Sequence, residues 1–182
     1  MTLPPDFQIT TEILWQGTLL FAVVDILFAA ILLWRLKSAV FRQIRWELIA
    51  ITAIFWCLLW VWAISNFWET VYQHMFPSWS CWLIPLFQAC LTAGIAALAF
   101  HFSYRSRMPL LTYLLFGGLW GMVTHTWAVY RGIVDRPPML HGASPLAAVV
   151  FPFFEFILYW CTIITFAALI HCIRKSKSFR RS

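Results

Sequence analysis

The sequence predicts an all-α fold, a polytopic bundle of five transmembrane helices with its N-terminus outside and its C-terminus in the cytoplasm. Three observations support this fold class for residues 1–182 as a single integral membrane domain. Of the 182 residues, 62% are hydrophobic and 11% are charged, and the mean hydropathy of +0.78 is far above that of soluble domains. Five apolar runs are each long enough to cross a bilayer as a helix of about 20 residues. The basic residues gather on one side of the membrane that these runs would cross.

The first two predicted spans cover roughly residues 13–34 and 46–68. The first is too long for a cleavable signal peptide and has no basic region before it, so we expect it to stay in the membrane as a helix. Asp25 lies near the middle of this first span. The second span ends just before Glu69, at its outer end.

The other three predicted spans cover roughly residues 82–102, 109–130 and 147–173. The connections between spans are short, which leaves no room for a soluble domain. The fourth span contains Gly117 and Gly121, four residues apart. Small residues at this spacing let two membrane helices approach closely, and we expect this contact inside the bundle rather than in a dimer.

Basic residues mark the side of the membrane that each loop occupies. The first loop, the third loop and the C-terminal tail carry 11 of the 13 Lys and Arg residues, namely Arg35, Lys37, Arg42, Arg45, Arg105, Arg107, Arg174, Lys175, Lys177, Arg180 and Arg181. Cytoplasmic loops are enriched in Lys and Arg, so this bias places the C-terminus in the cytoplasm. We expect a multi-pass protein of a bacterial inner membrane or of the ER membrane. Its basic clusters would be topology signals and contacts to anionic lipids, with no nucleic-acid partner.

Polar side chains from four predicted helices reach a similar depth in the outer part of the membrane. They are Glu69, Gln88, His125 and Glu155. A charge at bilayer depth costs about 2.5–3.5 kcal/mol on insertion scales, so such residues usually face the bundle interior and often serve function. We therefore interpret this convergence as a candidate site.

These residues also have structural interpretations. Glu69 can lie in interfacial water, His125 can bond a backbone carbonyl, and Asp25 can join two helices. Glu155 is harder to explain in this way, because it lies roughly 12 Å inside the start of its helix.

Aromatic side chains surround the candidate acid Glu69. The stretch NFWETVYQHMFPSW, residues 66–79, holds this one carboxylate among five aromatic residues, without Lys or Arg. Trp56 and Trp60 lie one helical turn apart in the second span and face either a cavity or lipid. Desolvation without a nearby cation favours the neutral form of a carboxyl group, which is a general acid, and aromatic faces stabilise a cation. This combination suits protonation of an alkene or epoxide and guidance of the resulting carbocation.

The sequence NFWETVY followed by FPS resembles the second-helix region of the membrane-embedded terpene cyclases of fungal and bacterial meroterpenoid and indole-diterpene pathways. The resemblance implies that Glu69 protonates the terminal epoxide or alkene of a prenyl chain, and that Trp68 and Tyr72 belong to its pocket. Asn66 stands three residues before the Glu, whereas the family's Asn stands four before it. The family has seven spans and takes its second acid from the last, so Glu155 would replace that acid by analogy. The emopamil-binding type of sterol isomerase is a five-span alternative with related chemistry.

We therefore expect an integral membrane enzyme that cyclises or isomerises an apolar isoprenoid-type lipid from the bilayer through an acid-generated carbocation, without a metal ion or organic cofactor. The expected catalytic residues are Glu69 and Glu155 as acid and base, supported by Asp25 and His125. The expected substrate-binding residues are Trp68, Tyr72, Asn66, Gln88, Trp56, Trp60 and Trp127.

Other functions fit the same composition. A non-catalytic membrane subunit or chaperone would use the polar residues to bind a lipid, a pigment or partner helices, with Gly117 and Gly121 at its interface. A metal enzyme is disfavoured, because no His or Glu pair has the HxxxH, HxxH or ExxH spacing that places two ligands on one helical face. A transporter is disfavoured because five spans do not divide into an inverted repeat.

Overall fold

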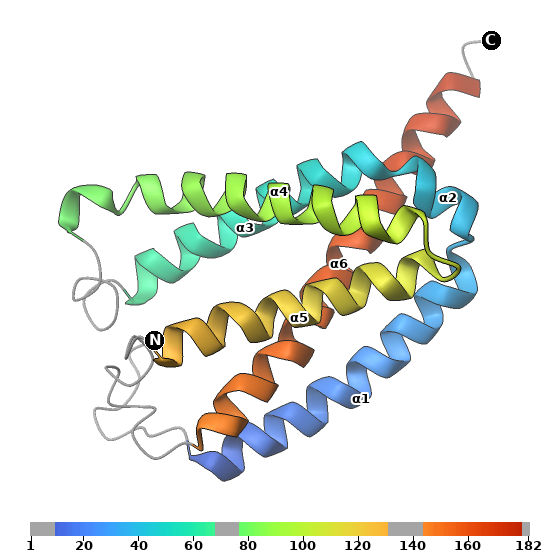
Figure 1. Cartoon of the computed structure of the whole chain (residues 1–182). Coiled ribbons are helices and arrows are strands. Elements are labelled where there is room, and N and C mark those ends of the chain that lie inside the picture. The colour runs from blue at the N-terminus through green and yellow to red at the C-terminus, as the bar shows by residue number, and fades with distance from the viewer. Residues whose placement is uncertain (1–9, 68–76, 131–143, 180–182) are drawn as a thin grey trace.

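The computed structural model describes residues 10–67, 77–130 and 144–179, together with all their side chains except those of residues 67, 125–130 and 177–179. The described chain is an all-α bundle (Figure 1). Its elements are α1 (Thr11–Arg35), α2 (Ser38–Gln43), α3 (Arg45–Phe67), the 3-10 turn η2 (Ser78–Ser80), α4 (Leu83–Tyr104), α5 (Pro109–Tyr130) and α6 (Pro145–Phe179). This architecture confirms the predicted fold class.

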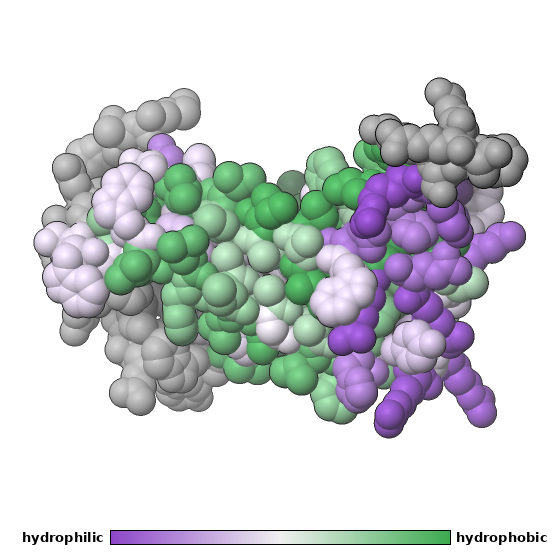
Figure 2. All heavy atoms as spheres, turned by 90° about the horizontal axis from the view of Figure 1, so that it is seen from above, coloured by the Kyte–Doolittle hydropathy of each residue, from purple (hydrophilic) through white to green (hydrophobic). Residues whose placement is uncertain are grey.

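Four of the described helices, α1, α3, α4 and α6, are long and apolar enough to cross a membrane. Helix α5 is also apolar over Pro109–Thr124, where its side chains are described, and it continues as helix to Tyr130. Figure 2 shows hydrophobic side chains across the middle of the molecule and hydrophilic ones gathered at one end. We call this the basic end, because the described Lys and Arg residues, which lie in or near the final turns of α1, α4 and α6 and in α2 and the start of α3, gather there. The other end is the outer end.

The structure departs from the predicted spans mainly in the length of the last helix and in the first loop. The last span was expected to end near residue 173, whereas α6 continues to Phe179 and carries its basic residues beyond the apolar region. The first loop was expected as a connection, whereas it folds into α2. Phe41 of α2 is fully buried, and its ring packs on Phe100 of α4 and Tyr113 of α5 at centroid distances of 5.4 and 5.5 Å. Helix α2 therefore closes the basic end of the bundle.

Helix α6 is the central element of the bundle. It packs on α1, α3 and α5, while α4 packs on α3 and α5 (Figure 1). At the outer end the Ser144 amide donates to Thr11 Oγ1 over 2.8 Å, and the rings of Phe21 and Phe151 meet edge to face at 5.3 Å. The starts of α1 and α6 are therefore joined.

Glycines allow α5 to approach α6 closely. A Cβ atom on Gly117 would lie 2.5 Å from the Trp160 ring, and one on Gly121 would lie 2.6 Å from the backbone carbonyl oxygen of Pro152. The predicted Gly117/Gly121 contact is thus packing inside the bundle, and the expectation of internal packing is confirmed.

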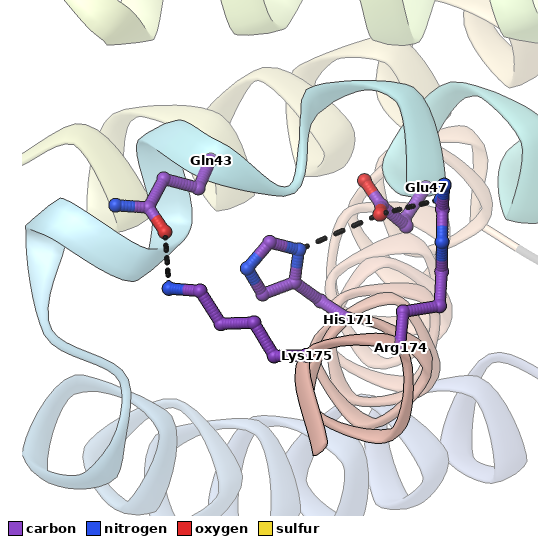
Figure 3. A network of polar contacts seen from close by, with 5 residues as sticks. All are labelled: Gln43, Glu47, His171, Arg174 and Lys175. Carbon is purple, nitrogen blue, oxygen red and sulfur yellow. Dashed lines mark hydrogen bonds and ion pairs between the residues drawn. The ribbon is translucent and has the colours of Figure 1, made fainter. Parts of the chain in front are cut away.

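A polar network fastens the far end of α6 to α2 and α3 at the basic end (Figure 3). Arg174 Nη1 donates to Glu47 Oε1 over 3.0 Å, and His171 Nδ1 lies 3.4 Å from the same oxygen. Lys175 Nζ donates to Gln43 Oε1 over 3.0 Å. The Glu47 side chain is only 10% exposed, so this carboxylate is held by neighbours on α6 rather than by bulk water.

Candidate functional site

The strongest candidate site is a carboxyl–phenol pair on α6. Tyr159 follows Glu155 by one helical turn, and its hydroxyl donates to Glu155 Oε1 over 2.5 Å. Residues four apart lie on the same face of a helix, so both side chains point to one side of α6. Both are partly buried, and the bond leaves the second carboxyl oxygen of Glu155 available for another partner.

Aromatic rings from α3 and α6 form a wall around this pair. The Trp56 ring lies 6.0 Å from the Tyr159 ring and 5.1 Å from the Phe156 ring. Phe55 lies 5.5 Å from the Tyr159 ring. Trp56 is 7% exposed, and its indole Nε1 is buried without a hydrogen-bond partner among the described residues. Trp56, which was predicted to bind substrate, therefore lies beside the Glu155–Tyr159 pair.

This arrangement combines a proton donor with surfaces that tolerate a cation. A carboxyl group in a poorly solvated site can hold a proton and deliver it, and the phenol fixes the orientation of that carboxyl. Ring faces attract a nearby positive charge through their quadrupoles. Sequence analysis did not single out Tyr159, Phe55 or Phe156, although the i, i+4 spacing of Glu155 and Tyr159 is a readable signal.

Asp25 occupies a different place in the bundle. It is 3% exposed on α1 and lies within electrostatic reach of Cys161 on α6. Cys161 follows Glu155 by six residues, which is about 9 Å along the helix and roughly 120° around it. The structure thus separates Asp25 from the Glu155–Tyr159 pair, and its supporting role stays a prediction.

Neither carboxylate oxygen of Asp25 has a hydrogen-bond partner among the described residues. An unsatisfied buried polar group costs about 1–3 kcal/mol, so we expect Asp25→Val to raise the free energy of unfolding by that amount. Thermal unfolding of the detergent-solubilised protein measures this change. Thr18→Val is the matched control, because Thr18 is 6% exposed on the same helix and its hydroxyl already donates to the Leu14 carbonyl. A destabilised Asp25→Val protein would contradict the prediction and would indicate a partner beyond the described residues.

The remaining predicted residues of the described chain have individual positions. Asn66 is exposed, and its side-chain amide donates to the Trp62 carbonyl over 2.7 Å, which occupies it within its own helix. Gln88 is partly buried on α4, and Trp60 is partly buried one turn beyond Trp56 on α3. Their role in binding a substrate stays a prediction.

Five of the predicted site residues have side chains outside the described part of the chain. Glu69, Trp68 and Tyr72 lie outside the described residues, as do the side chains of His125 and Trp127. The expected convergence of Glu69, Gln88, His125 and Glu155 at one depth therefore stays a prediction. Within the described part of the chain, no group of three His, Cys, Asp or Glu side chains is placed to hold a metal ion.

Comparisons of the chain with protein-family models, with curated proteins and with solved structures find no match. The functional argument therefore depends on the residues of this chain.

Proposed function

We propose that this chain is a membrane-embedded enzyme that isomerises or cyclises an isoprenoid-type lipid through an acid-generated carbocation. The observation that supports the proposal is the Glu155–Tyr159 hydrogen bond beside the rings of Trp56, Phe55 and Phe156. It supplies a proton donor and a cation-tolerant wall within the apolar part of the bundle, to which lipid has access.

In the proposed reaction, the neutral Glu155 carboxyl gives its proton to one carbon of a substrate alkene. The π electron pair forms the new C–H bond, and the other alkene carbon becomes a cation. Ring closure uses the π pair of a second alkene, or the cation migrates by hydride shift. Loss of a proton from a neighbouring carbon to a carboxylate then forms the product alkene. Atoms balance, and the product is an isomer of the substrate.

Glu69 is the second carboxyl in the proposal, and the resemblance to membrane-embedded terpene cyclases assigns it the role of acid. In that case Glu155 accepts the proton at the end of the reaction. The proposed orientation places the outer end outside the cytoplasm, following the distribution of basic residues. The site would then open toward the outer half of a bacterial inner membrane or of the ER membrane.

The test is a search for a product in lipid extracts. Cells expressing the wild type, Glu69→Gln or Glu155→Gln at equal protein level are fed polyprenyl and prenylated aromatic precursors, and extracts are compared by chromatography and mass spectrometry. We expect a product of unchanged mass and shifted retention, lost in either variant. In D2O, a product from alkene protonation carries one additional non-exchangeable deuterium, because the new C–H bond takes its proton from the enzyme. No isomer in any extract would contradict the proposal.

A non-catalytic membrane subunit is the second candidate. Cys90 and Gly94 lie four residues apart on the exposed face of α4, and a Cβ on Gly94 would meet nothing within 4 Å. Small residues on an open helix face permit close approach of a partner helix. Under this alternative, the extracts contain no isomer, and Gly94→Leu releases a membrane partner that copurifies with the wild type and with Glu155→Gln.

A further inference from the structure

A pocket at the basic end has no part in the proposed reaction. It has a volume of about 320 Å³ and is lined by the end of α1, the start of α2 and the connection between α4 and α5. These segments lie together at one end of the bundle (Figure 1). The volume falls within the range of about 300–1,000 Å³ that is usual for small-molecule sites.

The polar lining of this pocket is cationic. Lys37, Ser38 and Arg107 contribute to it, and no Asp or Glu does. The pocket also adjoins Pro109, the first residue of α5, where the helix dipole adds positive potential. The lining therefore favours an anion with oxygen acceptors.

The two pocket cations have no hydrogen-bond, ion-pair or aromatic partner among the residues that the structure describes. Most described cations at the basic end have a partner: Arg174 and Lys175 are hydrogen-bonded to side chains, and Arg35, Arg42 and Arg45 lie over aromatic rings. Among the described residues, Lys37, Arg105 and Arg107 have no such contact, and two of these three line the pocket. A ligand that neutralises Lys37 and Arg107 would give both pocket cations a partner.

The rim of the pocket is apolar and faces the surroundings of the bundle. Leu33 is 41% exposed and Met108 is 54% exposed, and both line the pocket. Leu33 lies on the same face of α1 as Ile26, two turns earlier, which is 67% exposed. An anion with an attached hydrocarbon chain would place its charge between Lys37 and Arg107 and its chain along Leu33.

We propose that this pocket binds the phosphate group of an anionic phospholipid from the leaflet at the basic end. Lys37 and Arg107 hold the phosphate, Ser38 donates a hydrogen bond to it, and the acyl chains follow the exposed side of α1. A lipid fits better than free phosphate, because the pocket lies where the apolar surface of α1 meets the basic end. The inference does not depend on the proposed reaction.

The test measures lipid binding to the purified full chain by native mass spectrometry. Phosphatidylglycerol is the probe, and phosphatidylcholine, which is zwitterionic with no net charge, is the reference. A cation held against an anionic lipid headgroup contributes about fivefold to affinity. Because Lys37 and Arg107 line the pocket, Arg107→Gln should weaken phosphatidylglycerol binding about fivefold, and Lys37→Gln with Arg107→Gln about 25-fold. Arg105→Gln is the matched control, because it removes an unpartnered cation of the same connection that lies outside the pocket lining. This control should change affinity by less than about twofold.

A second variant tests the pocket without changing charge. Met108→Trp fills the rim and should weaken phosphatidylglycerol binding while leaving thermal unfolding in lipid-free detergent unchanged. Equal losses in Arg105→Gln and Arg107→Gln would overturn the proposal, because binding would then reflect diffuse attraction to the basic end. The proposal would also be overturned if inorganic phosphate bound the protein as tightly as phosphatidylglycerol and displaced it at millimolar concentration. That result would indicate free phosphate as the ligand.

Discussion

We expect Glu155→Gln to slow the proposed isomer formation in isolated membranes by about 100- to 10,000-fold, the usual contribution of a positioned general acid or base. Glutamine has nearly the same shape, and its side-chain oxygen still accepts the hydrogen bond from Tyr159, so the protein keeps its fold. What it lacks is a transferable carboxyl proton. The measurement is the initial rate of isomer formation from an identified precursor at matched protein level.

A second variant and a control distinguish the loss of the carboxyl proton from a change in the orientation of the carboxyl group. Tyr159→Phe keeps the ring beside Trp56 but removes the donor to Glu155, so we expect a smaller loss, about tenfold, because the carboxyl remains and only its orientation is released. Glu12→Gln is the matched control, since this carboxylate is exposed in the first turn of α1 and should leave the rate unchanged. A fully active Glu155→Gln enzyme would remove Glu155 from the reaction.

Gly121→Ala lowers the free energy of unfolding by about 1–3 kcal/mol, the usual effect of overpacking a tight interface. The added methyl would lie 2.6 Å from the Pro152 carbonyl oxygen and 2.6 Å from the Phe156 ring. The ring can turn, but the backbone carbonyl can move only if α5 and α6 separate. The midpoint of thermal unfolding in detergent, read by size-exclusion chromatography after heating, measures the loss.

Gly94→Ala is the matched control for this substitution. Gly94 also lies within an apolar helix, but a Cβ there meets nothing within 4 Å. Alanine is a better helix former than glycine by about 1 kcal/mol, so Gly94→Ala should leave stability unchanged or raise it. Equal destabilisation of both variants would show that loss of helix flexibility, rather than the α5–α6 contact, explains the effect.

The five helices were predictable from the sequence because a bilayer requires long apolar runs, and such runs are visible without knowledge of packing. Helix α2 was not, because six residues are too few to show a period, and its existence depends on the burial of Phe41 against α4 and α5. The extension of α6 to Phe179 was missed for a related reason. Hydropathy reports where the apolar region ends, whereas this helix continues beyond it as a polar segment fastened by Glu47.

The sequence indicates how far along its helix each candidate residue lies, but not which neighbouring helix its side chain faces. Counting residues from the helix start placed Glu155 in the outer part of the bundle, and the structure places Trp56 of α3 beside the residue that Glu155 bonds. The same counting cannot tell which face of a helix a residue occupies relative to its neighbours. Asp25 and Glu155 were therefore predicted to serve one site, whereas Asp25 lies within electrostatic reach of Cys161, a residue on a different side of α6 from Tyr159.

The central position of α6 has a consequence for biosynthesis. Thr11 and Ser144 are hydrogen-bonded across 133 residues of sequence, so the start of α1 is made long before its partner. At translation rates of about 5–20 residues per second, the delay is roughly 7–27 seconds. During this time α1, α3 and α5 lack the helix that packs on all three of them in the finished bundle. Asp25, which is 3% exposed in the finished bundle, is then without the α6 neighbours that help to enclose α1. The newly made chain therefore passes through a stage in which this carboxylate is less enclosed, and the bundle forms only when its last described helix arrives.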